Sequence, residues 1–329
     1  MITDFDDEID LSDESPSGDG QELYEHFRFV ADKGQQLLRV DKFLVQRLEK
    51  SSRNRIQQAA DAGCILVNGK PVKSNYRVKP LDVVAVVMDR PRYELEIIPE
   101  NIPLDIVYED SELLVVNKPA GLVVHPGHGN YTGTLVNALA WHFKDDANYD
   151  VNDPRMGLVH RIDKDTSGLL VIAKTPDAKT HLGKQFFNKT TRREYVAVVW
   201  GVPNPLSGTI VGHVGRNPKD RLQMTVFTDG SQGKHAVTHY DVLEDLGYVS
   251  AVKCKLETGR THQIRVHMAH IGHPVAGDDV YGPKKVITSL SGQCLHAKKI
   301  GFVHPRTNEY IEFDSELPEY FEAFLKRCR

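Results

Sequence analysis

The stretch GLVHRIDKDTSGLLVIAK, from Gly157 to Lys174, sets charged residues beside an apolar run. Its segments GLVHR and GLLVIAK predict two short strands that flank a loop from Asp163 to Ser167. Charged groups next to a core strand are costly unless they are paired or take part in chemistry. Arg161 and Asp163 are two residues apart, so a strand would direct both side chains to one face. We therefore expect Asp163 to lie near the core, close to a cation.

Two interpretations of the loop acids Asp163 and Asp165 are open. Both could be turn residues whose carboxylates accept hydrogen bonds from nearby backbone amides. For Asp163 we favour a chemical role, because the later segment TGRTHQIR offers two more cations, Arg260 and Arg265. An arginine beside an aspartate keeps the carboxylate deprotonated and oriented, as a carboxylate nucleophile or base requires.

The composition predicts folded domains behind an acidic N-terminal segment. The chain has 329 residues, of which 40% are hydrophobic and 26% are charged, enough for two or three domains. Residues 1–25 contain ten Asp or Glu and no Lys or Arg, so the remainder carries 41 basic and 35 acidic side chains. We expect residues 1–30 to be a disordered, solubilising tail. The alternative is an RNA mimic that competes for the basic surface.

The cellular compartment is predicted from what the sequence lacks. It has no apolar run long enough to span a bilayer, and no signal-peptide pattern. Its four cysteines are scattered without a CxxC pair, which argues against a zinc site and a disulfide framework. We therefore expect a cytoplasmic protein that makes no membrane contact.

A basic window covers residues 33–80, with eleven Lys or Arg and only three acids. The segment LRVDKFLVQRLEK has an apolar stripe at helical spacing, and a second helix is predicted from about Ser52 to Ala62. The segment ILVNGKPV predicts a hairpin that turns at Asn68-Gly69. Two short helices and a hairpin with this excess of positive charge suit contact with a phosphate backbone.

Three segments of this window, RVDKFL, SRNRIQQAADAG and ILVNGK, resemble the S4-type RNA-binding domain. We place that domain at residues 37–88. The resemblance implies that basic side chains of the domain contact RNA, namely Arg39, Lys42, Arg53, Arg55, Lys70 and Lys73.

The rest of the chain alternates strands and helices. After a predicted linker at residues 89–104, LLVVNKPAGLVVHPG indicates strand, turn and strand, and TLVNALAWHF indicates a helix. Thr175-Pro176-Asp177 is typical of a helix start. REYVAVVWG, a strand pair that meets near Gly247, a helix in THQIRVHMAHIG and a strand in QCLHAKKIGFVHP follow. This order predicts an α+β domain at residues 105–329 with a mostly antiparallel, mixed sheet and flanking helices.

Five blocks of this domain occur in the order of a known enzyme family: NKPAGLVVHPG, HRIDKDTSGLLVIAK, RREYVAVVWG, LETGRTHQIRVHMAHIGHPVAGDDVYG and LHAKKIGFVHP. They resemble the RluA-type pseudouridine synthases. The resemblance implies that Asp163 is the catalytic carboxylate and that Arg265 pairs with it. It also implies that Arg161 takes the place of the flipped base, that Tyr195 stacks on the uracil and that Leu295 helps to wall the pocket.

The reaction that the resemblance implies breaks the N1–C1′ bond of uridine, turns the base and joins C5 to C1′. It involves no redox step and no net hydrolysis, so we expect no cofactor. The target base must leave its stack, at a cost of about a few kcal/mol. The sequence leaves open whether Asp163 attacks C1′, attacks C6 or acts as a base at C2′. The resemblance implies that the substrate is large-subunit (23S) ribosomal RNA within pre-ribosomal or assembled 50S particles, and we expect a monomer.

Two rival functions are weighed against this one. The run THQIRVHMAHIGHP contains His262, His267, His270 and His273, which suggests a metal-dependent hydrolase. The spacing does not match HExxH and the run has no carboxylate partner, so we predict no metal. A non-catalytic S4-containing assembly factor is the other rival, and the intact set of Asp163, Arg161, Tyr195 and Arg265 argues against it.

Overall fold

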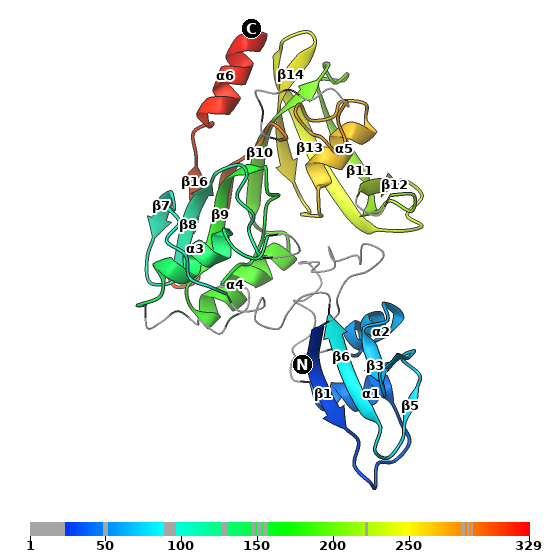
Figure 1. Ribbon diagram of the computed structural model, residues 1–329. Coiled ribbons are helices and arrows are strands. Elements are labelled where there is room, and N and C mark those ends of the chain that lie inside the picture. The colour runs from blue at the N-terminus through cyan, green and yellow to red at the C-terminus, as the bar shows by residue number, and fades with distance from the viewer. Residues whose placement is uncertain are drawn as a thin grey trace. The chain divides into compact units, whose positions relative to one another are not determined.

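The computed structural model describes residues 24–48, 52–88, 97–126, 130–146, 149, 153, 157–220, 223–283, 287, 290 and 292–329. The chain divides into two compact units, with the boundary between Ile97 and Ile98 (Figure 1). Of the described residues, 24–88 build the N-terminal unit around one hydrophobic core, and 98–329 build the larger unit around several.

The N-terminal unit combines a four-stranded sheet with two helices. The sheet has the order β1-β6-β3-β4, with β1 Tyr24–Val30, β6 Val83–Met88, β3 Ile65–Val67 and β4 Lys70–Pro71. A separate pair is formed by β2 Leu38–Arg39 and β5 Arg77–Val78. The helices are α1 Val40–Val45 and α2 Arg53–Asp61. Val40, Phe43, Leu44 and Ile56 bury the apolar stripes of both helices in the core.

The predicted hairpin is confirmed. Asn68 and Gly69 form the turn between β3 and β4 with φ values of 51° and 78°. Positive φ at both central positions is what a tight hairpin turn requires, and Asn-Gly tolerates it at little cost.

Two predicted boundaries were wrong. The tail was expected to extend to residue 30, but Tyr24–Val30 form β1, which pairs antiparallel with β6. The local sequence EHFRFV carries this strand, and the acidic composition concealed it. The tail's residues 1–23 lie outside the described residues.

The predicted linker, residues 89–104, was also too long at its C-terminal end. Ile98 and Glu100 already belong to the larger unit. The side-chain amide of Asn137 donates to the carbonyl of Ile98 (2.8 Å), and the amide of Glu100 donates to the carbonyl of Asn137 (3.0 Å). Residues 89–96 lie outside the described residues.

The larger unit is built on a ten-stranded sheet. The strand order is β12-β11-β13-β14-β10-β15-β9-β8-β7, and β16 pairs with β15 outside this path. The β15–β9 pair is parallel and the other described pairs are antiparallel. This confirms the predicted α+β class with a mixed, mostly antiparallel sheet. The strands are β7 Ile106–Glu109, β8 Leu113–Lys118, β9 Ser167–Ala173, β10 Arg192–Trp200, β11 Ser207–Arg216, β12 Met224–Phe227, β13 Lys234–Asp245, β14 Val249–Leu256, β15 Leu295–Val303 and β16 Tyr310–Asp314.

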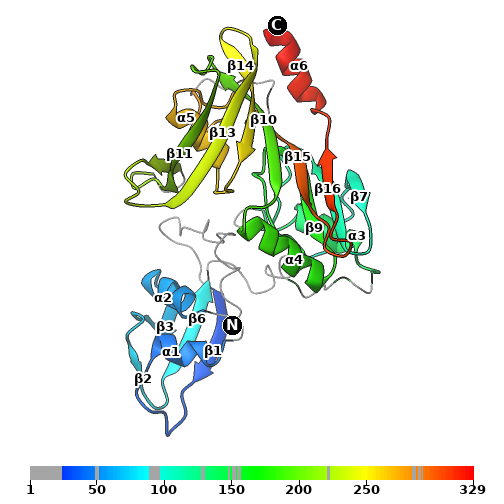
Figure 2. The ribbon, with the colours of Figure 1, turned by 180° about the vertical axis from the view of Figure 1, so that it is seen from behind.

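Among the described residues, four helices accompany the sheet: α3 Leu135–His142, α4 Pro176–Phe187, α5 Gln263–His270 and α6 Glu319–Cys328. The predicted start of α4 is confirmed, because the Thr175 hydroxyl accepts from the Ala178 amide and Pro176 is the first helical residue. Helix α4 packs on β9 and β15, and the view in Figure 2 shows it on that face of the sheet. None of the described helices has the length and apolarity needed to cross a bilayer.

Two predicted strands are absent from the described residues. In LVVHPG, the carbonyls of Val123 and Val124 accept from the first amides of α3 instead of pairing with a strand. In GLVHR, only Leu158 bridges to β9. The ring Nε2 of His160 accepts from the amide of Val171 (3.0 Å), so a side chain takes the bond that a strand would have supplied.

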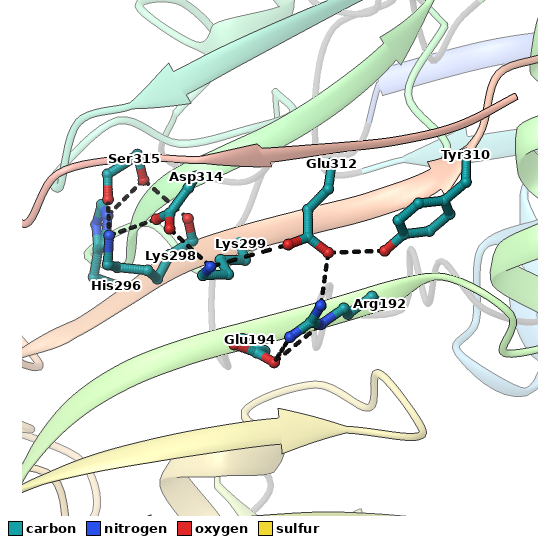
Figure 3. A network of polar contacts seen from close by, with 9 residues as sticks. All are labelled: Arg192, Glu194, His296, Lys298, Lys299, Tyr310, Glu312, Asp314 and Ser315. Carbon is teal, nitrogen blue, oxygen red and sulfur yellow. Dashed lines mark hydrogen bonds and ion pairs between the residues drawn. The ribbon is translucent and has the colours of Figure 1, made fainter. Parts of the chain in front are cut away.

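Figure 3 shows an ion-pair network across β10, β15 and β16. Arg192 pairs with Glu194 (2.7 Å) and Glu312 (2.9 Å), and Lys299 pairs with Asp314 (2.9 Å). Exposed pairs of this kind contribute little to stability, because water and salt screen them. They link three neighbouring strands, two of which carry residues of the pocket described next.

Candidate active site

One pocket of the larger unit is lined by all five residues that the sequence singled out for catalysis, Arg161, Asp163, Tyr195, Arg265 and Leu295. They come from the loop before β9, from β10, from α5 and from the first residue of β15. Segments separated by more than a hundred residues thus converge at one place. The further lining residues include His160, Thr166, Arg193, Arg260 and His262.

The loop that carries Asp163 is fixed by hydrogen bonds. The carbonyl of Asp163 accepts from the amide of Thr166 (3.1 Å), which closes a tight turn. Thr166 is buried, and its hydroxyl accepts from the side-chain amide of Gln293 (3.0 Å). The Asp163 side chain itself is 21% exposed, so its carboxylate reaches the pocket while its backbone is held.

A buried lysine, Lys118 at the end of β8, ties this loop to the turn that follows the strand. Its Nζ donates to the carbonyls of Pro119, Leu122 and Lys164, each at 2.8 Å. Burial lowers the pKa of Lys118 to about 7, against the opposing effect of Asp165 and Asp163. Three carbonyl acceptors match the three N–H donors of the ammonium form. Lys118 therefore fixes the backbone next to Asp163.

Arg265 lies between two carboxylates. Its Nε and Nη2 bind Asp278 in a bidentate fork, at 2.7 and 2.9 Å, and its Nη1 lies 3.2 Å from Oδ2 of Asp163. The Arg265 side chain is only 5% exposed and that of Asp278 is 0% exposed. The ring of Tyr281 lies against the guanidinium, 5.2 Å from its carbon to the ring centroid. Arg265 is thus held on several sides and offers one edge to Asp163.

The charge state of Asp163 follows from these neighbours. Burial alone would raise the pKa of the carboxyl, but His262, Arg265 and Arg161 outweigh it and lower the pKa below its ordinary value. Asp163 is therefore ionised at neutral pH. An ionised carboxylate in a partly buried pocket can act as a nucleophile or as a base.

Tyr195 and Leu295 form the wall of the pocket on neighbouring strands. Tyr195 pairs with Ala297, and Leu295 pairs with Ala197, so both side chains lie on the same face of the β10–β15 ladder. Burial raises the pKa of Tyr195, which keeps the phenol neutral. A neutral ring and an aliphatic wall suit the flat face of a base. Arg161 is exposed at the rim.

Sequence reasoning assigned no role to several residues that shape this site. They are Lys118, Asp278, Tyr281 and Gln293. Thr166 was expected only to shape the loop of Asp163, and His262 was weighed only as a metal ligand. Lys118 could have been noticed as a cation that ends an apolar strand. The place of His262 at this pocket could not have been predicted, because its left-handed backbone, with φ 55° directly before α5, is not visible in a sequence pattern. Non-glycine residues in that region are uncommon and gather at functional sites.

The histidine run is dispersed by the fold. His267 is buried with Nδ1 at 2.9 Å from the Thr238 hydroxyl, His262 Nδ1 lies 2.9 Å from the Tyr281 hydroxyl, and His270 is exposed. Within the described ranges, no three His, Cys, Asp or Glu side chains are grouped for metal binding. The geometry does not favour the hydrolase interpretation.

In the N-terminal unit, two of the predicted RNA-contacting residues share a buried acid. Arg39 and Arg53 both bind Oδ2 of Asp41, at 2.9 and 3.1 Å. Lys42, Lys70 and Lys73 are exposed, and the side chain of Arg55 lies outside the described residues. Burial would raise the pKa of Asp41, but hydrogen bonds from Arg39, Gln57 and Arg53 hold it well below its usual range.

Comparisons with known proteins agree with both units. The model of the RNA pseudouridylate synthase family matches residues 112–270, and that of the S4 domain matches residues 38–84. An uncharacterized RNA pseudouridine synthase of Bacillus subtilis is 49% identical over 91% of this chain and 97% of its own length. The ribosomal large subunit pseudouridine synthase D of Zymomonas mobilis is 43% identical over 88% of this chain and 93% of its own length.

The fold has a counterpart among solved structures. The human RNA pseudouridylate synthase domain containing 1 is 30% identical, covers 70% of this chain and 89% of its own, and superposes with a TM-score of 0.54. The resemblance drawn from the sequence blocks is therefore confirmed. The chain belongs to the RluA-type RNA pseudouridine synthases with an N-terminal S4 domain, enzymes that isomerise uridine in RNA.

Proposed function

We propose that this enzyme converts uridines of large-subunit (23S) ribosomal RNA to pseudouridine, with Asp163 as the catalytic carboxylate. Four relatives that are 40–43% identical carry the name ribosomal large subunit pseudouridine synthase D. The observation that carries the assignment of Asp163 is its ion pair with Arg265 at the pocket, 3.2 Å from Nη1 to Oδ2. The proposal includes a monomer in the cytoplasm that acts on ribosomal RNA within pre-ribosomal or assembled 50S particles.

Each pocket residue has a separate role in the proposed reaction. The flipped uracil stacks on the ring of Tyr195 and rests against Leu295, while Arg161 at the rim fills the gap left in the RNA. Ionised Asp163 then reacts with the nucleoside. The enclosed walls keep the detached uracil beside the ribose until C5 meets C1′. The chain's own side chains supply every role in this scheme.

The S4 domain supplies RNA affinity in this proposal. Arg39 and Arg53 present outward N–H groups while Asp41 fixes their position, and Lys42, Lys70 and Lys73 add exposed charge. Contacts of this kind bind phosphates without reading sequence. The catalytic pocket would then select the base, and the choice of uridine would come from RNA shape together with the S4 contacts.

The test is pseudouridine mapping of ribosomal RNA from cells with and without the gene. We expect one or more large-subunit pseudouridines to disappear in the deletion strain and to return with the wild-type gene. An unchanged large-subunit map, with pseudouridine lost from another RNA class, would contradict the proposed substrate while leaving the family's reaction intact.

A further inference from the structure

Asp278, which binds Arg265, is itself held by several hydrogen bonds. Oδ1 of Asp278 accepts from the amides of Val280 and Tyr281, each at 3.0 Å, in addition to Nη2 of Arg265. Oδ2 accepts from Nε of Arg265. The carboxylate is fully buried and is not among the residues that line the pocket. Asp278 therefore does not meet the substrate.

Asp278 and Asp163 make different numbers of hydrogen bonds with Arg265. Asp278 takes the bidentate fork at 2.7 and 2.9 Å, and Asp163 receives one contact at 3.2 Å. Charge-assisted N–H···O bonds are typically about 2.7–2.9 Å long, so the contact with Asp163 is the weaker one. If Asp278 were absent, Nε and Nη2 of Arg265 would be available to Asp163. Among the described residues, Asp163 is the only other carboxylate that Arg265 contacts.

We propose that Asp278 is a positioning residue that occupies the fork of Arg265, so that Arg265 orients Asp163 through a single N–H instead of capturing it in a bidentate ion pair. The consequence is a carboxylate that is held but still reactive. A bidentate pair would engage both oxygens of Asp163 and turn them away from the nucleoside. The inference rests on the proposed role of Asp163 as the catalytic carboxylate.

The test uses the full-length protein with Asp278→Asn. The amide retains an acceptor for the two backbone amides but cannot accept the fork of Arg265. Single-turnover rates are measured on an unmodified RNA that the wild type converts, from pH 6 to pH 9, together with RNA affinity and melting temperature. We expect the rate on bound RNA to fall about 100-fold at every pH, with RNA affinity unchanged.

Asp279→Asn is the matched control, because it makes the same charge change one residue further on, at an exposed position. It should retain the wild-type rate. Asp278→Glu keeps a carboxylate opposite the guanidinium and should retain more activity than Asp278→Asn at an equal folded fraction. Because the rates are compared at an equal folded fraction, the comparison of the Glu and Asn variants remains a test even if Asp278→Asn is poorly folded at the assay temperature.

Three results would overturn the inference: a wild-type rate in Asp278→Asn, a loss that disappears as the pH is raised, or equal rates in the Glu and Asn variants. The second would mean that Asp278 acts only by holding Arg265 where its positive charge keeps Asp163 ionised. Asp163→Asn, measured in parallel, separates this failure from that of the proposed function. If Asp163→Asn remains active, the role of Asp163 is wrong; if it is inactive while Asp278→Asn is normal, only the role of Asp278 is wrong.

Discussion

The two units each contain a cluster of aspartate and arginine, and the clusters have opposite compositions. In the N-terminal unit, one buried acid, Asp41, holds two arginines that are 38% and 49% exposed. In the catalytic unit, one buried arginine, Arg265, lies between Asp278 and the partly exposed Asp163. The first cluster therefore has a net positive charge, and the second has a net negative charge. The shared member, Asp41 or Arg265, is buried and orients its partners. Both arginines of the first cluster are exposed, whereas in the second cluster Asp163 is partly exposed and Asp278 is buried.

This difference matches the chemistry proposed for each unit. A phosphate backbone is bound by fixed cations, and a pair of arginines on one acid provides them with less side-chain freedom to lose. A reacting carboxylate must be ionised and oriented but not fully engaged, and a shared arginine provides that. The following predictions test whether the buried member of each cluster has the role assigned to it.

The largest effect on folding is expected for Arg265→Met. The change leaves the buried carboxylate of Asp278 without its cation, and breaking a buried pair costs about 3–5 kcal/mol. Thermal denaturation should therefore show a marked drop in melting temperature, whereas Asp163→Asn should leave the melting temperature within a few degrees of wild type. Equal melting temperatures for Arg265→Met and wild type would contradict the role of Arg265 as the cation that balances buried Asp278.

A smaller effect, on RNA binding, is expected for Asp41→Asn. The variant has one more net positive charge, so charge alone would tighten RNA binding. We instead expect about tenfold weaker binding, or about 1.4 kcal/mol, because Arg39 and Arg53 lose their shared anchor. Asp61→Asn makes the same charge change at an exposed site of the same unit and should bind as wild type or slightly tighter. Filter binding at fixed salt distinguishes the two, and tighter binding by Asp41→Asn would refute the anchoring role.

The smallest effect concerns acid stability. The folded-state pKa values of Asp41 and Asp163 both lie below their ordinary value. A carboxyl of this kind adds stability above its unfolded pKa of about 3.9, and this contribution is lost as the pH falls through the folded value. Melting temperature should therefore decline below about pH 4, and the decline should be shallower in Asp41→Asn than in Asp163→Asn. If the melting temperatures of both variants declined equally with falling pH, the expected larger contribution of Asp41 to acid stability would be contradicted.

Much of the fold and the pocket was predictable, and the failures have physical reasons. Period-two patterns revealed β10, β13 and β14, and helix-start residues revealed α4, because these signals are local. GLVHR was predicted as a strand since its apolar run is strand-like, but a ring nitrogen of His160 replaces the strand partner. β1 was missed because its short apolar run adjoins an acidic segment.

The residues of the candidate site likewise fall into those that the sequence predicted and those that it did not. The ordered sequence blocks singled out Asp163, Tyr195 and Arg265, and the fold brings them together around one pocket. Lys118 and Asp278 were given no role, since their partners are backbone groups and an arginine that only the fold brings within reach. Residues that act by holding other residues leave little trace in a pattern of residue types.

The most direct test of the account is single-turnover isomerisation by Asp163→Asn on an RNA that the wild type converts, with RNA affinity measured on the same samples. We predict wild-type affinity and a rate lower by on the order of 10⁴-fold or more, because the variant keeps the pocket and loses only the reacting carboxylate. A rate within about tenfold of wild type on bound RNA would contradict the central claim that Asp163 is the catalytic group.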